Sequence, residues 1–148
     1  MSTYTQLCYH IVFSTKERRP VLCEEHRDEL LKYMWGVVKE KQGHLYRINA
    51  TADHVHLLTS VHPTVAMADF IKDLKLSSSK WMKGHAGFSG FDHWQGGYSD
   101  FTHSKNERNG LIEYVKGQAE HHHKKSFIEE LRELLVEAGI DFEERYLG

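Results

Sequence analysis

Two short segments rich in strand-forming residues follow one another in this chain with only two residues between them. Residues 44–51 and 54–61 are both predicted to be strands, and Ala52 and Asp53 leave room for nothing longer than a tight turn. Strands joined this closely pair as an antiparallel hairpin. The hairpin therefore predicts a sheet that is mainly antiparallel.

The remaining elements interleave helices with single strands. Two Ser-x-x-Glu capping boxes, at Ser104 and Ser126, mark the starts of the last two helices. The predicted elements are a strand over 4–15, helices over 24–41 and 63–83, a glycine-rich loop over 84–98, a short strand over 101–103, and helices over 104–125 and 126–138. This order predicts an α+β fold, with helices packed on the sheet.

The length and charge distribution indicate one domain with an unusual end. The 148 residues suffice for a single core, expected over about 4–125, followed by an acidic helix and tail over 126–148. Residues 129–148 hold seven acidic and two basic side chains, which leaves the rest of the chain mildly basic at +3. No apolar run is long enough for a membrane span and the first residues lack a signal-peptide pattern, so we expect a cytoplasmic protein.

The second strand of the hairpin carries His54 and His56. Side chains two positions apart in a strand point to the same face, so the two imidazoles are a partial ligand set for a divalent ion. The alternative is a pair of partly exposed strand histidines in a chain that has twelve histidines. The spacing alone favours neither interpretation.

A tyrosine and a glutamine share one face of the helix predicted over 104–125. Tyr114 and Gln118 are four residues apart, which places them one above the other on a helix. Taken alone, the pair favours a structural role, because a tyrosine and a polar residue at this spacing are common on half-buried helices.

These residues occur within a series of blocks that resembles a known family. The chain is similar to the HUH nucleases, and in particular to single-tyrosine transposases of the insertion-sequence 200/605 type. The matching blocks lie in family order: Tyr9-His10-Ile11-Val12-Phe13-Ser14-Thr15-Lys16 with Arg18-Arg19-Pro20, Asp53-His54-Val55-His56-Leu57-Leu58, Trp94-Gln95-Gly96-Gly97-Tyr98 with Phe101-Thr102-His103-Ser104, and Tyr114-x-x-x-Gln118 with Glu120-His121-His122.

The resemblance implies a ferredoxin-like or RRM-like HUH fold and a chemical role for each residue of the two pairs. His54, His56 and Gln118 would coordinate Mg²⁺ or Mn²⁺, with Asp53 and His122 next to these ligands. Tyr114 would attack a phosphodiester of DNA and form a 5′-phosphotyrosine, so that rejoining needs no ATP.

The resemblance also implies partners. The family acts on hairpins in single-stranded DNA as a homodimer, with the sheet extended across the dimer and each active site shared between chains. Candidate phosphate contacts are two basic groups, although lysines on a helix are also common as a merely solvated face: Lys16, Arg18 and Arg19, and Lys72, Lys75, Lys80 and Lys83.

The predicted function is therefore that of a DNA transposase. Three alternatives remain open at this point. They are a domesticated HUH nuclease that processes repetitive DNA hairpins without mobilising itself, a catalytically inactive DNA-binding dimer, and a zinc hydrolase that uses His54, His56 and one of His121 or His122.

Overall fold

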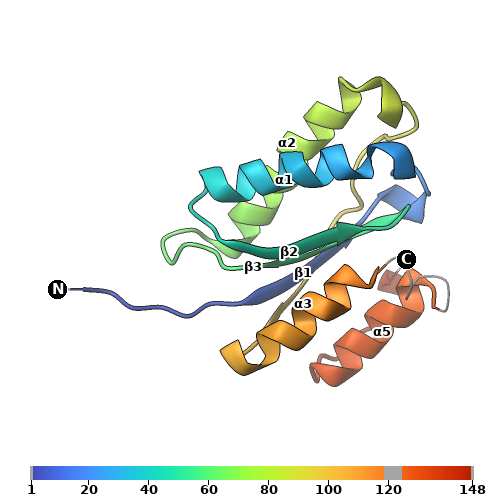
Figure 1. Ribbon diagram of the computed structural model, residues 1–148. Coiled ribbons are helices and arrows are strands. Elements are labelled where there is room, and N and C mark those ends of the chain that lie inside the picture. The colour runs from blue at the N-terminus through green and yellow to red at the C-terminus, as the bar shows by residue number, and fades with distance from the viewer. Residues whose placement is uncertain (1, 119–124, 148) are drawn as a thin grey trace.

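A four-stranded antiparallel sheet lies between two pairs of helices in the computed structural model, which describes residues 2–118 and 125–147 (Figure 1). The strands are β1 (Tyr9–Ser14), β2 (Leu45–Ala50), β3 (His54–Thr59) and β4 (Ser99–Thr102), in the spatial order β2-β3-β1-β4. Helices α1 (Arg27–Glu40) and α2 (Met67–Lys83) cover one face, and α3 (Arg108–Lys116) and α5 (Phe127–Glu137) cover the other.

The predicted α+β fold and the hairpin of β2 and β3 are confirmed, while several boundaries differ. Strand β1 begins at Tyr9 rather than at residue 4, because its neighbours β3 and β4 pair with it only from Tyr9 onwards. Helix α2 begins at Met67, since Ala66 still has an extended backbone. Helix α3 ends at Lys116, before Gln118, which was predicted to lie on the same helix as Tyr114. Residues 119–124, which were predicted to extend it, lie outside the described part of the chain.

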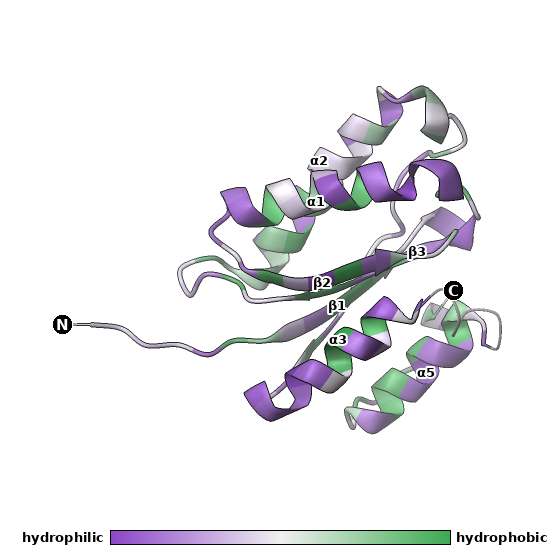
Figure 2. Cartoon of the chain, viewed as in Figure 1, coloured by the Kyte–Doolittle hydropathy of each residue, from purple (hydrophilic) through white to green (hydrophobic). Residues whose placement is uncertain are grey.

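Each face of the sheet contributes side chains to a different apolar cluster. Ile11 and Phe13 of β1 face α1 and α2 and belong to the larger apolar cluster. Val12 is paired with His56 and points the other way, toward α3 and α5. Hydrophobic and hydrophilic residues alternate along these helices, as expected for helices that bury one side (Figure 2). The second face therefore receives the histidine pair.

The acidic C-terminal helix α5 is packed as part of the fold. The hydroxyl of Ser126 accepts a hydrogen bond from the backbone N–H of Glu129, as the predicted capping box requires at the start of the helix. Its apolar side packs on the sheet through Phe127, Leu131 and Leu135, which cluster with Val12 and Phe101. None of the helices in the described ranges has the length and apolar character needed to cross a membrane.

Candidate active site

The His54 and His56 side chains lie side by side on the face of β3 that α3 and α5 cover. Their ring centroids are 5.1 Å apart, and both residues are completely buried. Their burial contradicts the alternative of partly exposed strand histidines. Buried imidazoles need polar partners, and the residues around the two rings supply them.

Asp53 and Thr51 fix the proton arrangement of His54. The Asp53 carboxylate lies 2.7 Å from Nδ1 of His54, and the Thr51 hydroxyl lies 2.8 Å from the same nitrogen. Burial lowers the pKa of His54, but hydrogen bonds with Asp53 and Glu130 outweigh it and raise the pKa above its usual value. With the Nδ1 proton donated to Asp53, Nε2 presents its lone pair to the interior of the site, as in metal-binding histidines oriented by a carboxylate.

His10 of β1 orients His56 in a similar way, and the sequence prediction did not include it. Nε2 of His10 lies 2.8 Å from Nδ1 of His56, and the two rings are stacked. Burial, followed by the proximity of His56 and His103, lowers the pKa of His10 to about 3. A neutral His10 accepts the Nδ1 proton of His56, so Nε2 is the nitrogen of that ring that faces the interior of the site. The alternation along β1 put His10 on one face, but only the register, which pairs His10 with Leu58 and Val12 with His56, placed it diagonally beside His56.

The carboxylate of Glu130 enters the site from α5, and it too was not predicted. Oε1 lies 2.7 Å from Nε2 of His56 and 3.6 Å from Nε2 of His54. Oε2 accepts a hydrogen bond of 2.6 Å from the side-chain amide of Gln118. Burial raises the pKa of this carboxyl, but hydrogen bonds with His54 and His56 reverse the effect and hold the pKa well below its usual range. Glu130 is therefore a buried anion between the predicted ligands.

The donors that meet here fit a divalent cation. Ligand atoms of His54, His56 and Glu130 all lie within 4.8 Å of one another. Gln118 is fully buried, and among the described residues its Oε1 has no hydrogen-bond partner. Two imidazole nitrogens and a carboxylate oxygen form a mixed set that suits ions such as Mn²⁺ better than two imidazoles alone.

Tyr114 lies directly beside this cluster in the same chain. Its ring makes edge contacts with His56 and His10, at centroid distances of 5.9 and 6.0 Å. Burial raises the pKa of the phenol above its usual value, and the negative charge of Glu130 raises it further. A cavity of about 570 Å³ opens next to the ring between β4, α3 and α5, and Phe101 and Glu137 are among the residues that line it.

The predicted basic residues fall in two places. Lys16, Arg18 and Arg19 form a turn after β1, at the end of the sheet where the Thr15 N–H donates to the carbonyl of Asp53. Lys72, Lys80 and Lys83 are on α2, in the layer on the far side of the sheet from Tyr114.

Two other predicted site residues need separate mention. The ammonium of Lys75 donates to the backbone carbonyls of Gln95 and Gly97, so it anchors the loop before β4. His122 lies outside the described residues.

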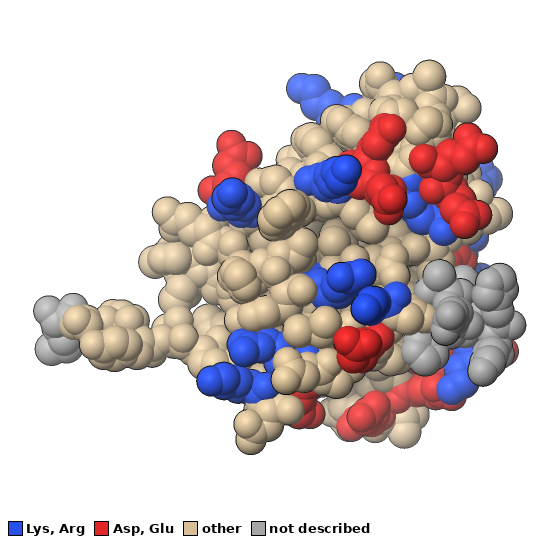
Figure 3. All heavy atoms as spheres, viewed as in Figure 1, with Lys and Arg blue, Asp and Glu red and all other residues tan. Residues whose placement is uncertain are grey.

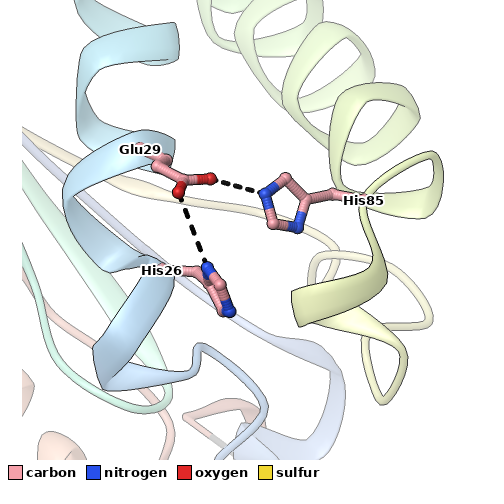
Figure 4. A group of neighbouring side chains, drawn as sticks. All are labelled: His26, Glu29 and His85. Atoms are coloured by element: carbon pink, nitrogen blue, oxygen red, sulfur yellow. Dashed lines mark hydrogen bonds and ion pairs between the residues drawn. The ribbon is translucent and has the colours of Figure 1, made fainter.

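A second group with metal-ligand chemistry lies in the other helical layer, where His26, Glu29 and His85 converge (Figure 4). The backbone N–H of Gly87 donates to Nδ1 of His85, so the proton of a neutral His85 is on Nε2 and is donated to Glu29. Neither ring nitrogen of His85 then has a lone pair to offer an ion. We interpret this group as a hydrogen-bonded clamp between the start of α1 and the end of α2.

Comparison with known proteins assigns the chain to a family. Residues 3–118 match the family described as Transposase IS200 like, which is well over half of the chain. The chain belongs to the IS200-like transposase family. Its predicted family resemblance is thereby confirmed.

Two bacterial transposases are similar to this chain along most of their length. The ISDra2 transposase TnpA of Deinococcus radiodurans is 30% identical over 118 residues, which cover 76% of this chain and 84% of that protein. The transposase for insertion sequence element IS200 of Salmonella typhimurium is 29% identical over 117 residues, with 76% of each chain covered.

Two solved structures share the fold. A putative transposase from Deinococcus radiodurans has a TM-score of 0.62 and 26% identity, over 80% of this chain and 96% of that chain. A REP-associated tyrosine transposase bound to a REP hairpin has a TM-score of 0.56 and 12% identity, over 80% and 72%. The four-stranded antiparallel sheet with its helices is thus the family's fold.

Proposed function

We propose that this IS200-like transposase cuts and rejoins single-stranded DNA through a covalent bond to Tyr114, with no need for ATP. The observation that carries the proposal is the buried polar cluster beside the Tyr114 ring, in which His54 and His56 meet Glu130 and Gln118 donates a hydrogen bond to Glu130. The cluster supplies a ligand set and a nucleophile, which together are sufficient for a phosphodiester transfer.

We propose that His54, His56 and Gln118 hold Mg²⁺ or Mn²⁺. The unpartnered Oε1 of Gln118, and the orientation of His54 by Asp53, support this choice of ligands among the described residues. The ion would act as a Lewis acid that offsets negative charge on a non-bridging oxygen of the scissile phosphate.

The remaining chemistry belongs to Tyr114. Its Oη forms a bond to phosphorus while the bond from phosphorus to the 3′-oxygen breaks, and the phenol proton is lost as the 3′-oxygen gains one. The products are a 5′-phosphotyrosine and a free 3′-hydroxyl. Attack by a 3′-hydroxyl on this ester reverses the step and joins strands, because the transferred phosphodiester retains its bond energy in the tyrosine ester.

Hairpins in single-stranded DNA are the proposed substrate, and a REP hairpin is what the REP-associated transposase of the same fold holds. The proposed assembly is a homodimer, as the family resemblance implies. Within one chain Tyr114 already lies beside its own His56, so a single chain brings both halves of a site together. Sharing of sites between two chains remains a prediction.

Covalent trapping tests the proposal. The native chain and Tyr114→Phe would each be incubated with labelled single-stranded hairpin DNA and Mn²⁺, followed by denaturing electrophoresis. We expect a protein–DNA adduct with the native chain and none with Tyr114→Phe. Tyr98→Phe removes the same atom from an exposed ring and should leave the adduct unchanged. Strand cleavage that survives Tyr114→Phe would favour a water-attacking zinc hydrolase instead.

A further inference from the structure

Helix α5 places a carboxylate where a substrate phosphate would need to bind. The two oxygens of Glu130 occupy the hydrogen-bonding positions of His56 Nε2, at 2.7 Å, and of the Gln118 amide, at 2.6 Å. A phosphate oxygen that approaches the proposed ligand set needs the same space, and it carries the same sign of charge. Glu130 and a scissile phosphate therefore exclude each other.

The helix that carries Glu130 lies beyond the part of the chain that the family shares. The family match ends at residue 118, and α5 begins at Phe127. The ligands and the nucleophile lie within residues 3–118, whereas the carboxylate that fills the site comes from the C-terminal extension. Glu130 thus enters the candidate site from outside the matched residues.

Apolar anchors hold α5 against the sheet. Phe127, Leu131 and Leu135 are at most 8% exposed and pack on Val12 and Phe101. Buried contacts of this kind stabilise the docked position, and they form a cluster separate from the larger core on the opposite face.

The charge of α5 opposes DNA, while the neighbouring surface attracts it. The helix holds four glutamates and one arginine. Basic side chains lie over β2 and the adjacent α3, and acidic ones lie along α5 (Figure 3); the basic residues of these elements are Arg47, Arg108 and Lys116. A strand drawn to β2 and α3 would meet repulsion at α5 before it reached Tyr114.

We propose that α5 is an intramolecular lid that competes with DNA for the active site and must undock before the scissile phosphate can enter. The proposal rests on the proposed function, since it takes single-stranded DNA as the substrate. In the closed form Glu130 stands in for the phosphate. DNA affinity is then reduced by the fraction of molecules in which the lid is open.

Hydrogen exchange measures the lid directly. The full chain carrying Tyr114→Phe, which cannot form the adduct, would be studied with and without Mn²⁺ and a single-stranded oligonucleotide that forms one hairpin. We expect the amides of residues 127–137 to exchange about tenfold faster when DNA is bound, with no change in α1. Unchanged or slower exchange in α5 while DNA is bound would overturn the lid.

A matched pair of substitutions tests the role of the carboxylate. Glu130→Gln and Glu129→Gln each remove one charge from the first turns of α5, but Glu130 is buried in the site and Glu129 lies outside it. In the Tyr114→Phe background, Glu130→Gln should tighten binding of the hairpin oligonucleotide about tenfold, because a neutral amide oxygen accepts the Gln118 hydrogen bond more weakly than the carboxylate does in the closed form. Glu129→Gln should change the affinity less than about twofold.

The outcomes separate the two proposals. Equal effects of the two substitutions, or weaker binding with Glu130→Gln, would overturn the lid while leaving the Tyr114 chemistry standing. Adduct formation by the native chain is measured separately and depends on that chemistry alone. If the oligonucleotide bound to none of the variants, DNA would not be the substrate and both proposals would fail.

Discussion

The Nε2 atom of His10 lies 2.8 Å from Nδ1 of His56, and this hydrogen bond joins two adjacent strands beneath the proposed nucleophile. His10 is 1% exposed and His56 is fully buried, so neither ring can exchange this partner for water. The hydrogen bond determines which nitrogen of His56 is available to a metal ion. His10 is therefore a positioning residue for the site.

Replacing His10 should weaken metal binding without removing a ligand. In His10→Phe the ring keeps roughly its size but cannot accept the Nδ1 proton of His56. Removal of such an orienting hydrogen bond typically costs about 10–100-fold in metal affinity, and we expect a decrease of that size for Mn²⁺ by isothermal titration calorimetry. His93→Gln, in an exposed loop, is the control. Unchanged affinity in His10→Phe would contradict the assigned role.

Asp53→Asn tests the orientation of His54. The asparagine oxygen can still accept the Nδ1 proton, but the negative charge that strengthens this hydrogen bond is gone. We expect about tenfold weaker Mn²⁺ binding, measured by the same titration, and a smaller effect than that of His10→Phe. Asp69→Asn, on the exposed side of α2, should bind Mn²⁺ as the native chain does. If Asp53→Asn and Asp69→Asn bound Mn²⁺ with equal affinity, Asp53 would have no role in orienting His54 for metal binding.

Asp100 of β4 should make stability depend on pH. Burial raises the pKa of this carboxyl to about 6 from 3.8, so folding favours its protonated form. Its stabilising effect is fully present below pH 3.8 and is lost as the pH rises through about 6. Asp100→Asn should therefore be more stable than the native chain at pH 7, by about 1 kcal/mol because the group is only half-buried, and the difference should shrink toward pH 4.

Urea unfolding at about pH 4.5 and pH 7 measures this difference for Asp100→Asn. Asp141→Asn is the control, because it removes a carboxylate that is exposed and not one that folding buries. A stability difference between Asp100→Asn and the native chain that stays constant between the two pH values would show that burial of the carboxyl is not its origin.

Replacing glycine by alanine should have opposite effects on stability at two positions, Gly87 and Gly36. A Cβ at Gly87 would lie 2.2 Å from the His26 ring, so Gly87→Ala should force apart the clamp between α1 and α2 and destabilise the fold by about 1–3 kcal/mol. A Cβ at Gly36 would meet nothing within 4 Å, and Gly36→Ala should stabilise α1 by about 0.5–1 kcal/mol. Thermal unfolding checks both. A Gly87→Ala variant as stable as Gly36→Ala would contradict the close packing.

Much of the site was predictable because it depends on local periodicity. The two-residue connection predicted the hairpin, and the alternation along its second strand put His54 and His56 on one face. Tyr114 lies on α3 as predicted, but α3 ends at Lys116, so Gln118 lies beyond the helix that was predicted to carry both residues. The family match to residues 3–118 supports the blocks in which these residues stand.

The sequence by itself determined most of the elements, the family and the candidate ligands and nucleophile, because short-range spacing sets which side chains share a face. Only the tertiary structure decided that His10 orients His56 and that Glu130 enters the site. Those hydrogen bonds span 46 and 74 residues and depend on the register of β1 against β3 and on the side that α5 buries. The acidic helix that was predicted to follow the core is packed over the candidate active site, because its apolar side covers the second face of the sheet.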